Sequence, residues 1–493
     1  MGGRTVQLMT NLTLTFARLG KALPLACLLV AACSSNGLLS KPGSAPVPNR
    51  PVSPRVDDLE RRTFEFFWDT TNPRNGLVRD KFPTPSFASV AAVGFGLSAY
   101  LAGIERGYVS RQAARERVLT TLRFFHDAPQ GADPVGMTGY HGFYYHFLDM
   151  TTGARFSKEV ELSTIDTALL LGGVLACEGY FDRANSKEQE IRRLAEELYR
   201  RVDWAWAATP EGAVALGWTP EAGFHPMHWQ GYNEGMIIYV LGLGSPTHPL
   251  PDGAWQQWTA TYERAWATSY GQTFLTFPPL FGHQFSHVWI DFRGVRDDYM
   301  RAHGLDYFEN SRRATYAQQA YAIANPMRWK DYGERVFGLS AADGPARMTV
   351  AEGPMLRVFR RYAARGMGGA STYDDGTLSP SALISSAPFA PEIVLPAVEE
   401  ILDRYGQHVN LKYGFVDSFD PSFEYDVEVP AGAIVKGVGW FDGDYLGIDS
   451  GSTITMLENY RSDLFWRLLR RTPYVRRGLE RAGFTGGWLD APP

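Results

Sequence analysis

Glu234 stands where a carboxylate could act as an acid. It follows Tyr232-Asn233, a pair that can cap a helix, and it precedes the apolar run Met236–Leu243. A cap at Tyr232-Asn233 would place the carboxylate of Glu234 in the first turn of a helix, beside aromatic rings. Such an environment can shift the pKa of an acid. The alternative is that Glu234 only complements the helix dipole. We take Glu234 as the main catalytic candidate.

Hydrolysis that begins with proton donation also needs a second carboxylate, as base or as nucleophile. Acids beside aromatic or glycine-rich segments could supply it, and the candidates are Asp449, Asp166, Glu161 and Asp343. Asp449 and Asp166 rank first, because the segment 446–451 opens a helix whose Glu458 and Asn459 could support Asp449. For Asp166, which we expect in the first turn of its own helix, capping alone is an equal alternative.

The elements that must position these acids are predicted to be helices, because apolar residues recur at helical spacing between loops rich in glycine and proline. The predicted helices are Asp57–Asp69, Phe87–Arg106, Ser110–His126, Leu162–Phe181, Ser186–Ala207, Glu234–Gly242, Asp252–Tyr270, Arg296–Asn325 with a break, Pro391–Tyr405, Gly451–Arg470 and Tyr474–Ala482. About a dozen helices indicate an all-α fold of paired helices. Periodicity does not separate a closed ring of such pairs from an open solenoid.

Composition narrows the functional classes. The chain has 493 residues, 45% of them hydrophobic, which is enough for a large core. The net charge is -5 and no run of lysine and arginine exceeds two residues, so the sequence lacks the basic stripe of a nucleic-acid binder. Aromatic residues make up 13% of the chain, and aromatic rings suit the apolar faces of sugar rings.

The N-terminus has the pattern of an export signal. Arg18 and Lys21 precede the apolar run Ala22–Ala32, which is too short to span a bilayer. Small residues before Cys33 form a lipobox, so we expect residues 1–33 to be a lipoprotein signal peptide ending at a lipidated Cys33. An ordinary cleaved signal peptide is the alternative. Ser34 after the cysteine favours the outer membrane, and the predicted location is periplasmic and lipid-anchored.

A single globular domain is expected after the signal. Residues 34–55 form a linker rich in proline and serine, and residues 56–493 show no second linker of this kind. Cys177 is then the one cysteine of the mature domain, so no intramolecular disulfide is expected there. It lies in an apolar helix and is predicted to be a buried hydrophobic residue.

Six segments carry a family resemblance: FYYHFLDMTTG, ELSTIDTALLL, GYNEGMIIYVLGLGSPTHPLP, PLFGHQFSHVWIDFRG, YFENSRRATYAQQAYAIAN and FAPEIVLPAVEEIL. From Leu59 to Phe484 the chain resembles the bacterial glycoamylase-like family, nearest to the β-1,2-glucanases of glycoside hydrolase family 144. The resemblance implies an (α/α)6 barrel, a toroid of about twelve helices, that acts on glucan oligo- or polysaccharides. It also implies that Glu234, in the GYNE motif, takes part in glycoside cleavage.

The resemblance bears on the mechanism as well. The β-1,2-glucanases are regarded as inverting, which requires a wide gap between the two carboxylates. In the related cyclic-glucan synthase branch a Ser-Glu pair falls where this chain has Ser340-Ala341. That departure argues against a retaining mechanism here and leaves Asp343 as a possible substitute.

Polar and aromatic residues cluster in the loops between the predicted helices, and loops on one rim commonly form a binding site. The candidate sugar-binding residues are Tyr144, His146, Trp229, Tyr232, Asn233, His283, His287, Trp289, Asp291, Arg293 and Trp440. His283 and His287 are spaced as metal ligands could be, but no glutamate follows the first histidine and two prolines precede it. We therefore expect neither a metal nor another cofactor.

Other functions stay open at this point. The same scaffold could cleave an α-glucan or another glycan, or act as a lyase with tyrosine and histidine as bases. A glycan-binding lipoprotein without catalysis is a third hypothesis, although several carboxylates at one rim favour an enzyme. We expect a monomer that contacts the membrane through its lipid anchor only and binds no nucleic acid.

Overall fold

A computed structural model describes residues 49–368 and 372–491. The predicted signal peptide with Cys33 and most of the linker lie outside these residues. Where the linker is described, it already belongs to the folded body: the amide of Arg50 donates to the carbonyl of Arg461 at 2.9 Å, and Ser53 caps the first helix by accepting from the amide of Val56. The folded domain therefore begins slightly before residue 56.

Helices dominate the described chain. They are α1 (Pro54–Thr70), α2 (Val90–Glu105), α3 (Arg111–Asp127), α4 (Thr164–Tyr180), α5 (Ser186–Arg200), α6 (Met236–Gly244), α7 (Ala254–Thr259), α8 (Tyr262–Ala265), α9 (Phe285–Trp289), α10 (Asp298–His303), α11 (Tyr307–Ala324), α12 (Pro380–Ser385), α13 (Pro391–Val409), α14 (Gly447–Ser462), α15 (Leu464–Leu469) and α16 (Pro473–Arg481). Short 3-10 helices cover Leu280–His283 and Gly487–Asp490.

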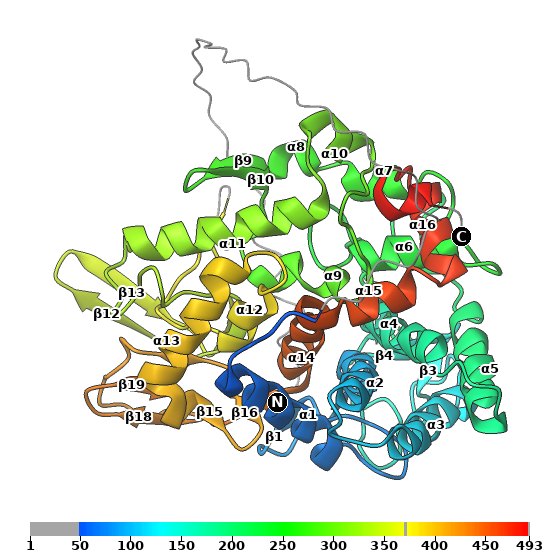
Figure 1. Cartoon of the computed structure of the whole chain (residues 1–493), viewed down its shortest axis with the longest axis horizontal. Coiled ribbons are helices and arrows are strands. Elements are labelled where there is room, and N and C mark those ends of the chain that lie inside the picture. The colour runs from blue at the N-terminus through cyan, green and yellow to red at the C-terminus, as the bar shows by residue number, and fades with distance from the viewer. Residues whose placement is uncertain (1–48, 369–371, 492–493) are drawn as a thin grey trace, which may run out of the picture.

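The helices form an inner and an outer set. Figure 1 shows α2, α4, α9, α12 and α14 surrounded by α1, α3, α5, α11, α13 and α16. The inner helices α2, α4, α6 and α14 are buried along almost their whole length, whereas α1, α3 and α5 bury one face. This difference follows from the sequence, because the inner helices are apolar or small on all sides and the outer ones are amphipathic.

Glycines let the inner helices approach closely. A Cβ atom on Gly173 of α4 would lie 2.1 Å from the carbonyl oxygen of Gly94 of α2, and one on Gly94 would lie 2.3 Å from the carbonyl oxygen of Leu169. The two backbones therefore touch, and a larger residue at either position would push the helices apart. Cys177, also in α4, is free and buried, as predicted.

Strands are short and antiparallel. They are β1 (Lys81–Phe82), β2 (Ala88–Ser89), β3 (Gly139–Tyr140), β4 (Phe143–Tyr145), β5 (Phe147–Leu148), β6 (Leu162–Ser163), β7 (Gly217–Thr219), β8 (Gly223–Phe224), β9 (Trp266–Ser269), β10 (Gln272–Leu275), β11 (Ala341–Asp343), β12 (Met348–Glu352), β13 (Met355–Phe359), β14 (Tyr362–Ala364), β15 (Asn410–Leu411), β16 (Gly414–Phe415), β17 (Phe419–Asp420), β18 (Ala433–Val435), β19 (Gly439–Phe441) and β20 (Tyr445–Leu446). The largest sheet has the order β3-β4-β6-β7-β8. Several strands end where an inner helix begins: β2 leads into α2, β6 into α4 and β20 into α14.

Two predicted helices differ from the structure. The segment Asp252–Tyr270 forms α7 and α8 and then turns into β9, which pairs with β10 through a turn at Tyr270, where φ is +46°. The segment Gly451–Arg470 is divided at Asp463, whose φ of +55° ends α14 and starts α15. The short helices α9 and α12 were not predicted.

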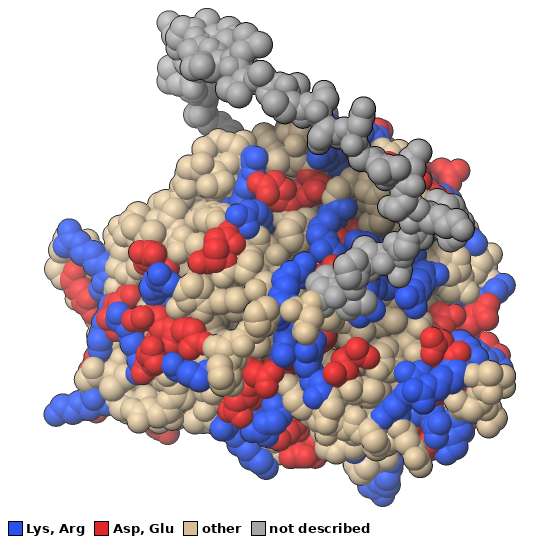
Figure 2. All heavy atoms as spheres, viewed as in Figure 1, with Lys and Arg blue, Asp and Glu red and all other residues tan. Residues whose placement is uncertain are grey.

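Charges of both signs are mixed on the outer surface. On the face viewed in Figure 2, basic and acidic side chains lie beside one another. Surface pairs such as Arg61 with Asp58, at 2.6 Å, contribute little to stability, so the buried charges are the informative ones. Within the described ranges no helix is both long enough and apolar enough to cross a bilayer.

Candidate active site

Acidic side chains gather where the inner helices begin. Asp166 lies in the first turn of α4, Asp449 lies in the first turn of α14, and Glu234 stands two residues before α6. Strand β1 pairs with β20, with Lys81 opposite Leu446, and this pairing brings Asp80 and Lys81 to the start of α14. We call the acidic cluster the group Asp80, Asp166, Glu234, Asp343, Asp417, Asp442 and Asp449.

Glu234 is a buried acid with an unused oxygen. Its relative exposure is 6%, and its Oε2 atom has no hydrogen-bond partner. Burial raises the pKa of Glu234 to about 7, and the nearby charge of Asp166 adds to this rise. The backbone is fixed on both sides, because Ser286 donates to the carbonyl of Glu234 at 2.8 Å and Asn233 accepts from the amide of Gly235 at 2.8 Å. Near neutral pH this carboxyl can therefore donate a proton.

His146 bridges two of the predicted acids. Its Nδ1 atom lies 2.8 Å from Glu161 Oε1, and its Nε2 atom lies 3.5 Å from Asp166 Oδ1. Burial alone would lower the pKa of His146, but the charges of Asp166 and Glu161 raise it to about 9. Asp166 is held further by the Ser163 hydroxyl, which donates to its Oδ2 at 2.5 Å. The histidine is thus a cation fixed between two carboxylates.

Asp449 belongs to a group of acids that has few positively charged partners. Burial raises the pKa of Asp449 to about 6, and the charges of Asp80 and Asp343 add to the rise. Burial, followed by repulsion from Asp449 and Asp343, raises the pKa of Asp417 well above its usual range. Lys81 forms an ion pair with Asp343 on the edge of this group. Without a cation beside it, Asp417 is therefore harder to ionise than Asp449.

Sequence reasoning missed Asp80, Asp417, Asp442 and Tyr362. Tyr362 stands opposite Asp343 in the β11–β14 pair, and burial together with the charges of Asp449 and Asp417 raises the pKa of its hydroxyl. These four residues lie at the ends of very short strands, so they join the cluster only through strand pairing. A local signal existed for Asp442 alone, in a loop dense with aspartates.

Two groups of aromatic rings lie near Asp166 and its partner His146. Phe147 stacks on His146 with ring centroids 3.8 Å apart, and it continues through Phe87 to Phe156, whose relative exposure is 47%. A second group contains Trp218 of β7 and Phe224 of β8, which both pack on Trp206. These rings offer apolar faces beside the acidic cluster.

Several predicted binding residues are buried instead. Tyr144, Trp289 and Trp440 are at most 1% exposed, and each donates a hydrogen bond to an interior oxygen at 2.8–3.1 Å. They are core residues, and the prediction that they bind sugar is not supported by their placement. Trp229 and Tyr232 are also buried, at 5% and 4%, and they pack behind Glu234. Of the predicted binding residues, His146 and Asn233 remain beside the acids.

The two histidines that suggested a metal are also interior residues. His283 Nε2 lies 3.0 Å from the carbonyl of Phe277, and His287 Nε2 lies 3.2 Å from the hydroxyl of Ser311. Burial lowers the pKa of His283 to about 4 and that of His287 to about 3, so both are neutral. Each ring is only 1% exposed, so neither can contact a substrate.

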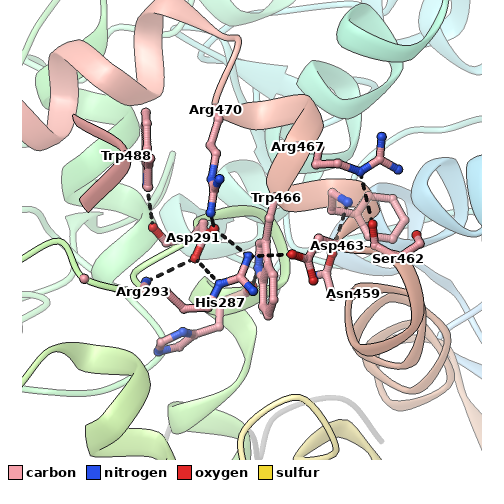
Figure 3. Close-up of polar contacts among 12 residues, drawn as sticks. His287, Asp291, Arg293, Asn459, Ser462, Asp463, Trp466, Arg467, Arg470 and Trp488 are labelled. Carbon is pink, nitrogen blue, oxygen red and sulfur yellow. Dashed lines mark hydrogen bonds and ion pairs between the residues drawn. The ribbon is translucent and has the colours of Figure 1, made fainter. Parts of the chain in front are cut away.

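Asp291 and Arg293 lie at the opposite end of the inner helices from the acids. Asp291 binds Arg293 through two hydrogen bonds of 2.8 Å and also pairs with Arg470, while Arg293 reaches Asp463, the residue that ends α14 (Figure 3). Asp463 and Asp449 are roughly 20 Å apart along α14, since each residue adds about 1.5 Å. We call Asp291, Arg293, Asp463 and Arg470 the arginine network. The structure therefore does not bring Asp291 and Arg293 together with the predicted acids.

Comparison with known proteins gives one consistent result. Residues 226–473 match the Glycoamylase family model, described as "Putative glucoamylase". A solved structure from Bacteroides uniformis, also described as a "putative glucoamylase", is 31% identical and covers 90% of this chain and 100% of its own, with a TM-score of 0.77. An endo-β-1,2-glucanase from Chitinophaga pinensis, solved with sophorotriose and glucose, is 28% identical, with a TM-score of 0.75 and coverage of 88% and 98%.

A curated relative points the same way. The exo β-1,2-glucooligosaccharide sophorohydrolase of Parabacteroides distasonis is 27% identical over 457 residues, which is 86% of this chain. This chain spans little more than half, 57%, of that longer protein.

Proposed function

Because this chain belongs to the Glycoamylase family, we propose that it is a glycoside hydrolase that cleaves β-1,2-linked glucan. Two relatives that match most of the chain are named for hydrolysis of β-1,2-glucans or their oligosaccharides. One of them acts as an endo-enzyme and the other as an exo-enzyme, so the common element is the linkage. The linkage is what we carry over to this chain.

The proposal rests on the protonation and the burial of the Glu234 carboxyl. A buried carboxyl with a pKa near 7 and a free oxygen can hold a proton at neutral pH and release it to a bound leaving group. In the proposed reaction Glu234 protonates the glycosidic oxygen as the bond from that oxygen to the anomeric carbon breaks. Glu234 is then ionised and regains a proton from solvent.

Asp449 is proposed as the base. It removes a proton from a water molecule while the water oxygen bonds to the anomeric carbon from the opposite side, which inverts the anomeric configuration. The charge of Asp166 acts on Glu234, whereas the carboxylates that act on Asp449 are Asp80 and Asp343. Asp449 thus does not share its charge environment with the acid as closely as Asp166 does, and an inverting mechanism predicts a water molecule between Asp449 and Glu234. Asp166 as the base is the alternative, and Glu161 and Asp343 support the charges around the two.

Aromatic rings around the acids are proposed to bind the sugar. Phe156 and Phe224 are 47% and 41% exposed; Phe156 leads through Phe87 and Phe147 to His146, and Phe224 lies on β8 of the sheet whose strand β6 precedes Asp166. A pyranose ring can place its C–H face on such a ring, and the hydroxyl groups then meet the carboxylates.

We also propose that the paired helices close into an (α/α)6 barrel. The first inner helix, α2, contacts the last, α14, so closely that a Cβ atom on Gly451 would lie 2.2 Å from the Cβ atom of Phe95. Contact between the first and last members of the inner set is what a closed ring requires.

Attachment to a membrane through Cys33, after export, remains a proposal from the sequence. It fits the geometry, because Arg50 hydrogen-bonds to Asp463 at the end of α14 that is remote from Asp449. A tether from that end would leave the acidic cluster facing away from the membrane. Loss of membrane association in Cys33→Ala, with activity kept, is the expected result, and unchanged association would contradict it.

Product analysis tests the proposed activity. The domain of residues 49–493 is incubated with linear β-1,2-glucan, β-1,3-glucan, starch and cellulose, with Glu234→Gln as the control. We expect sophorose-type products from β-1,2-glucan alone and none from the variant, and the chain lengths separate endo from exo action. Cleavage of starch only, or an unsaturated product that absorbs in the ultraviolet, would replace the proposal with an α-glucanase or a lyase. Binding without turnover would replace it with a glycan-binding protein.

A further inference from the structure

Three aspartates of the acidic cluster are arranged as ligands for a cation. One carboxylate oxygen from each of Asp343, Asp417 and Asp442 lies within 4.8 Å of the other two. Asp417 and Asp442 are 1% and 2% exposed, and the side chain of Asp343 is 16% exposed. Three carboxylates this close repel one another strongly unless a positive charge or protons lie between them.

In Asp417 and Asp442 a backbone amide fixes one carboxylate oxygen and leaves the other available. Asp417 Oδ2 accepts from the amide of Asp343 at 2.7 Å, and Asp442 Oδ1 accepts from the amide of Gly443 at 2.7 Å. The remaining oxygens, Asp417 Oδ1 and Asp442 Oδ2, are buried and have no hydrogen-bond partner. In Asp343 it is Lys81 that takes Oδ2. Unpartnered buried oxygens are costly, so their presence on two neighbouring aspartates points to a missing ligand.

The strand framework holds these residues in place before any ligand arrives. The amide of Asp442 donates to the carbonyl of Ser418 at 3.0 Å, and the amide of Asp417 donates to the carbonyl of Asp444 at 2.9 Å. The Ser418 hydroxyl donates to the carbonyl of Asp343 at 2.8 Å. The three ligands thus come from three segments that hydrogen bonds join directly, and a preformed site of this kind loses little entropy on binding.

We propose that Asp343, Asp417 and Asp442 bind a hard divalent cation of the Ca²⁺ type. Oxygen donors alone suit Ca²⁺, which takes six to eight of them in flexible geometry, and water would fill the positions that three carboxylates leave open. Mg²⁺ is less suited because it requires a near-ideal octahedron. With three protein ligands we expect a Kd on the order of 10⁻⁵ to 10⁻³ M. The site does not depend on the proposed β-1,2-glucanase activity, because binding is measured without substrate.

Calorimetric titration of the chelator-treated domain with CaCl₂, in parallel with thermal unfolding, tests the site. The variant is Asp442→Asn. The matched control is Asp420→Asn, because Asp420 is also buried, has one oxygen held by a backbone amide at 2.8 Å and the other unpartnered, and is not one of the three ligands. We expect one Ca²⁺ per chain and a higher Tm with Ca²⁺, with affinity at least tenfold weaker in Asp442→Asn and unchanged in Asp420→Asn.

Two results would overturn the proposal. If the wild-type domain shows neither binding heat nor a change of Tm, protons and not a cation hold the three aspartates together. If Ca²⁺ binds equally well to Asp442→Asn, the ion occupies another part of the molecule. Because both readouts omit glucan, a failed activity test leaves this result unaffected.

Discussion

The two ends of the inner helices both contain buried charge, but they balance it differently. In the arginine network, Asp291 is fully buried and contacts two arginines, Arg293 and Arg470. In the acidic cluster, Glu234 and Asp449 form no ion pair with an arginine or lysine of the described residues, and burial raises the pKa of each. A balanced network stabilises a fold once it is formed, whereas unbalanced acids cost stability and persist where they serve chemistry. The contrast assigns structure to one end and catalysis to the other.

The largest expected effect comes from Glu234→Gln. We expect kcat on β-1,2-glucan to fall by about 10³-fold or more, because the proton donor is lost.

The Glu234→Gln variant should keep its stability, unlike a variant of the arginine network. The raised pKa of Glu234 means that its ionisation destabilises the fold as the pH rises from about 4.5 through 7, so the variant should match or exceed the wild-type Tm at pH 8. A large loss of Tm together with kcat would make Glu234 structural.

In the arginine network, Asp291→Asn should lower stability and leave activity nearly unchanged, the reverse of what we expect for Glu234→Gln. Removing the carboxylate leaves Arg293 and Arg470 without their buried partner, and such a loss typically costs about 3–5 kcal/mol in the free energy of unfolding. Denaturant unfolding measures it, with the exposed pair variant Asp298→Asn as a control expected to change by less than about 1 kcal/mol. Activity per folded molecule should stay near that of wild type, and a specific loss of kcat would contradict the division between the ends.

A smaller effect is expected for His146→Gln. His146 supplies the positive charge between Asp166 and Glu161, so its loss should raise the pKa of both acids and lower kcat by about 10- to 100-fold. The pH–rate profile should shift toward higher pH, and Glu161→Gln should reproduce part of the loss. An unchanged pH–rate profile would mean that His146 has no influence on the reacting acids.

The smallest effect is expected for Phe156→Ala. If its exposed ring binds a sugar, KM should rise by about 2- to 10-fold with kcat nearly constant, which corresponds to the usual contribution of one aromatic contact. Leu356→Ala, at a more exposed apolar residue on the β12–β13 hairpin, serves as the control. Equal behaviour of both variants would remove Phe156 from the proposed binding surface.

Local signals in the sequence predicted much of the fold. Ser110 caps α3 by accepting from the amide of Ala113, and Ser163 caps α4 by accepting from the amide of Asp166, as serine commonly does before a helix. The apolar runs that follow became buried helices. Such features depend on neighbours within a few residues, so the sequence contains them directly.

The assembly of the site could be predicted only in part. Glu234, Asp166 and Asp449 were found because each stands at the start of an apolar run. Asp417 was missed because hydrogen bonds between distant segments bring it into the cluster. Asp291 was misplaced because a polar loop carries no signal for the end of the inner helices at which it lies. Which loops meet is decided by tertiary packing and not by local pattern.

The most direct test of the account is the pKa of Glu234 itself. It can be measured from the pH dependence of the side-chain carboxyl ¹³C signal in glutamate-labelled protein, with Glu234→Gln used to assign the signal. We expect a pKa near 7, as burial beside Asp166 requires. A value near 4.5 would show that Glu234 is ionised at neutral pH, and it would contradict the role of this carboxyl as the proton donor.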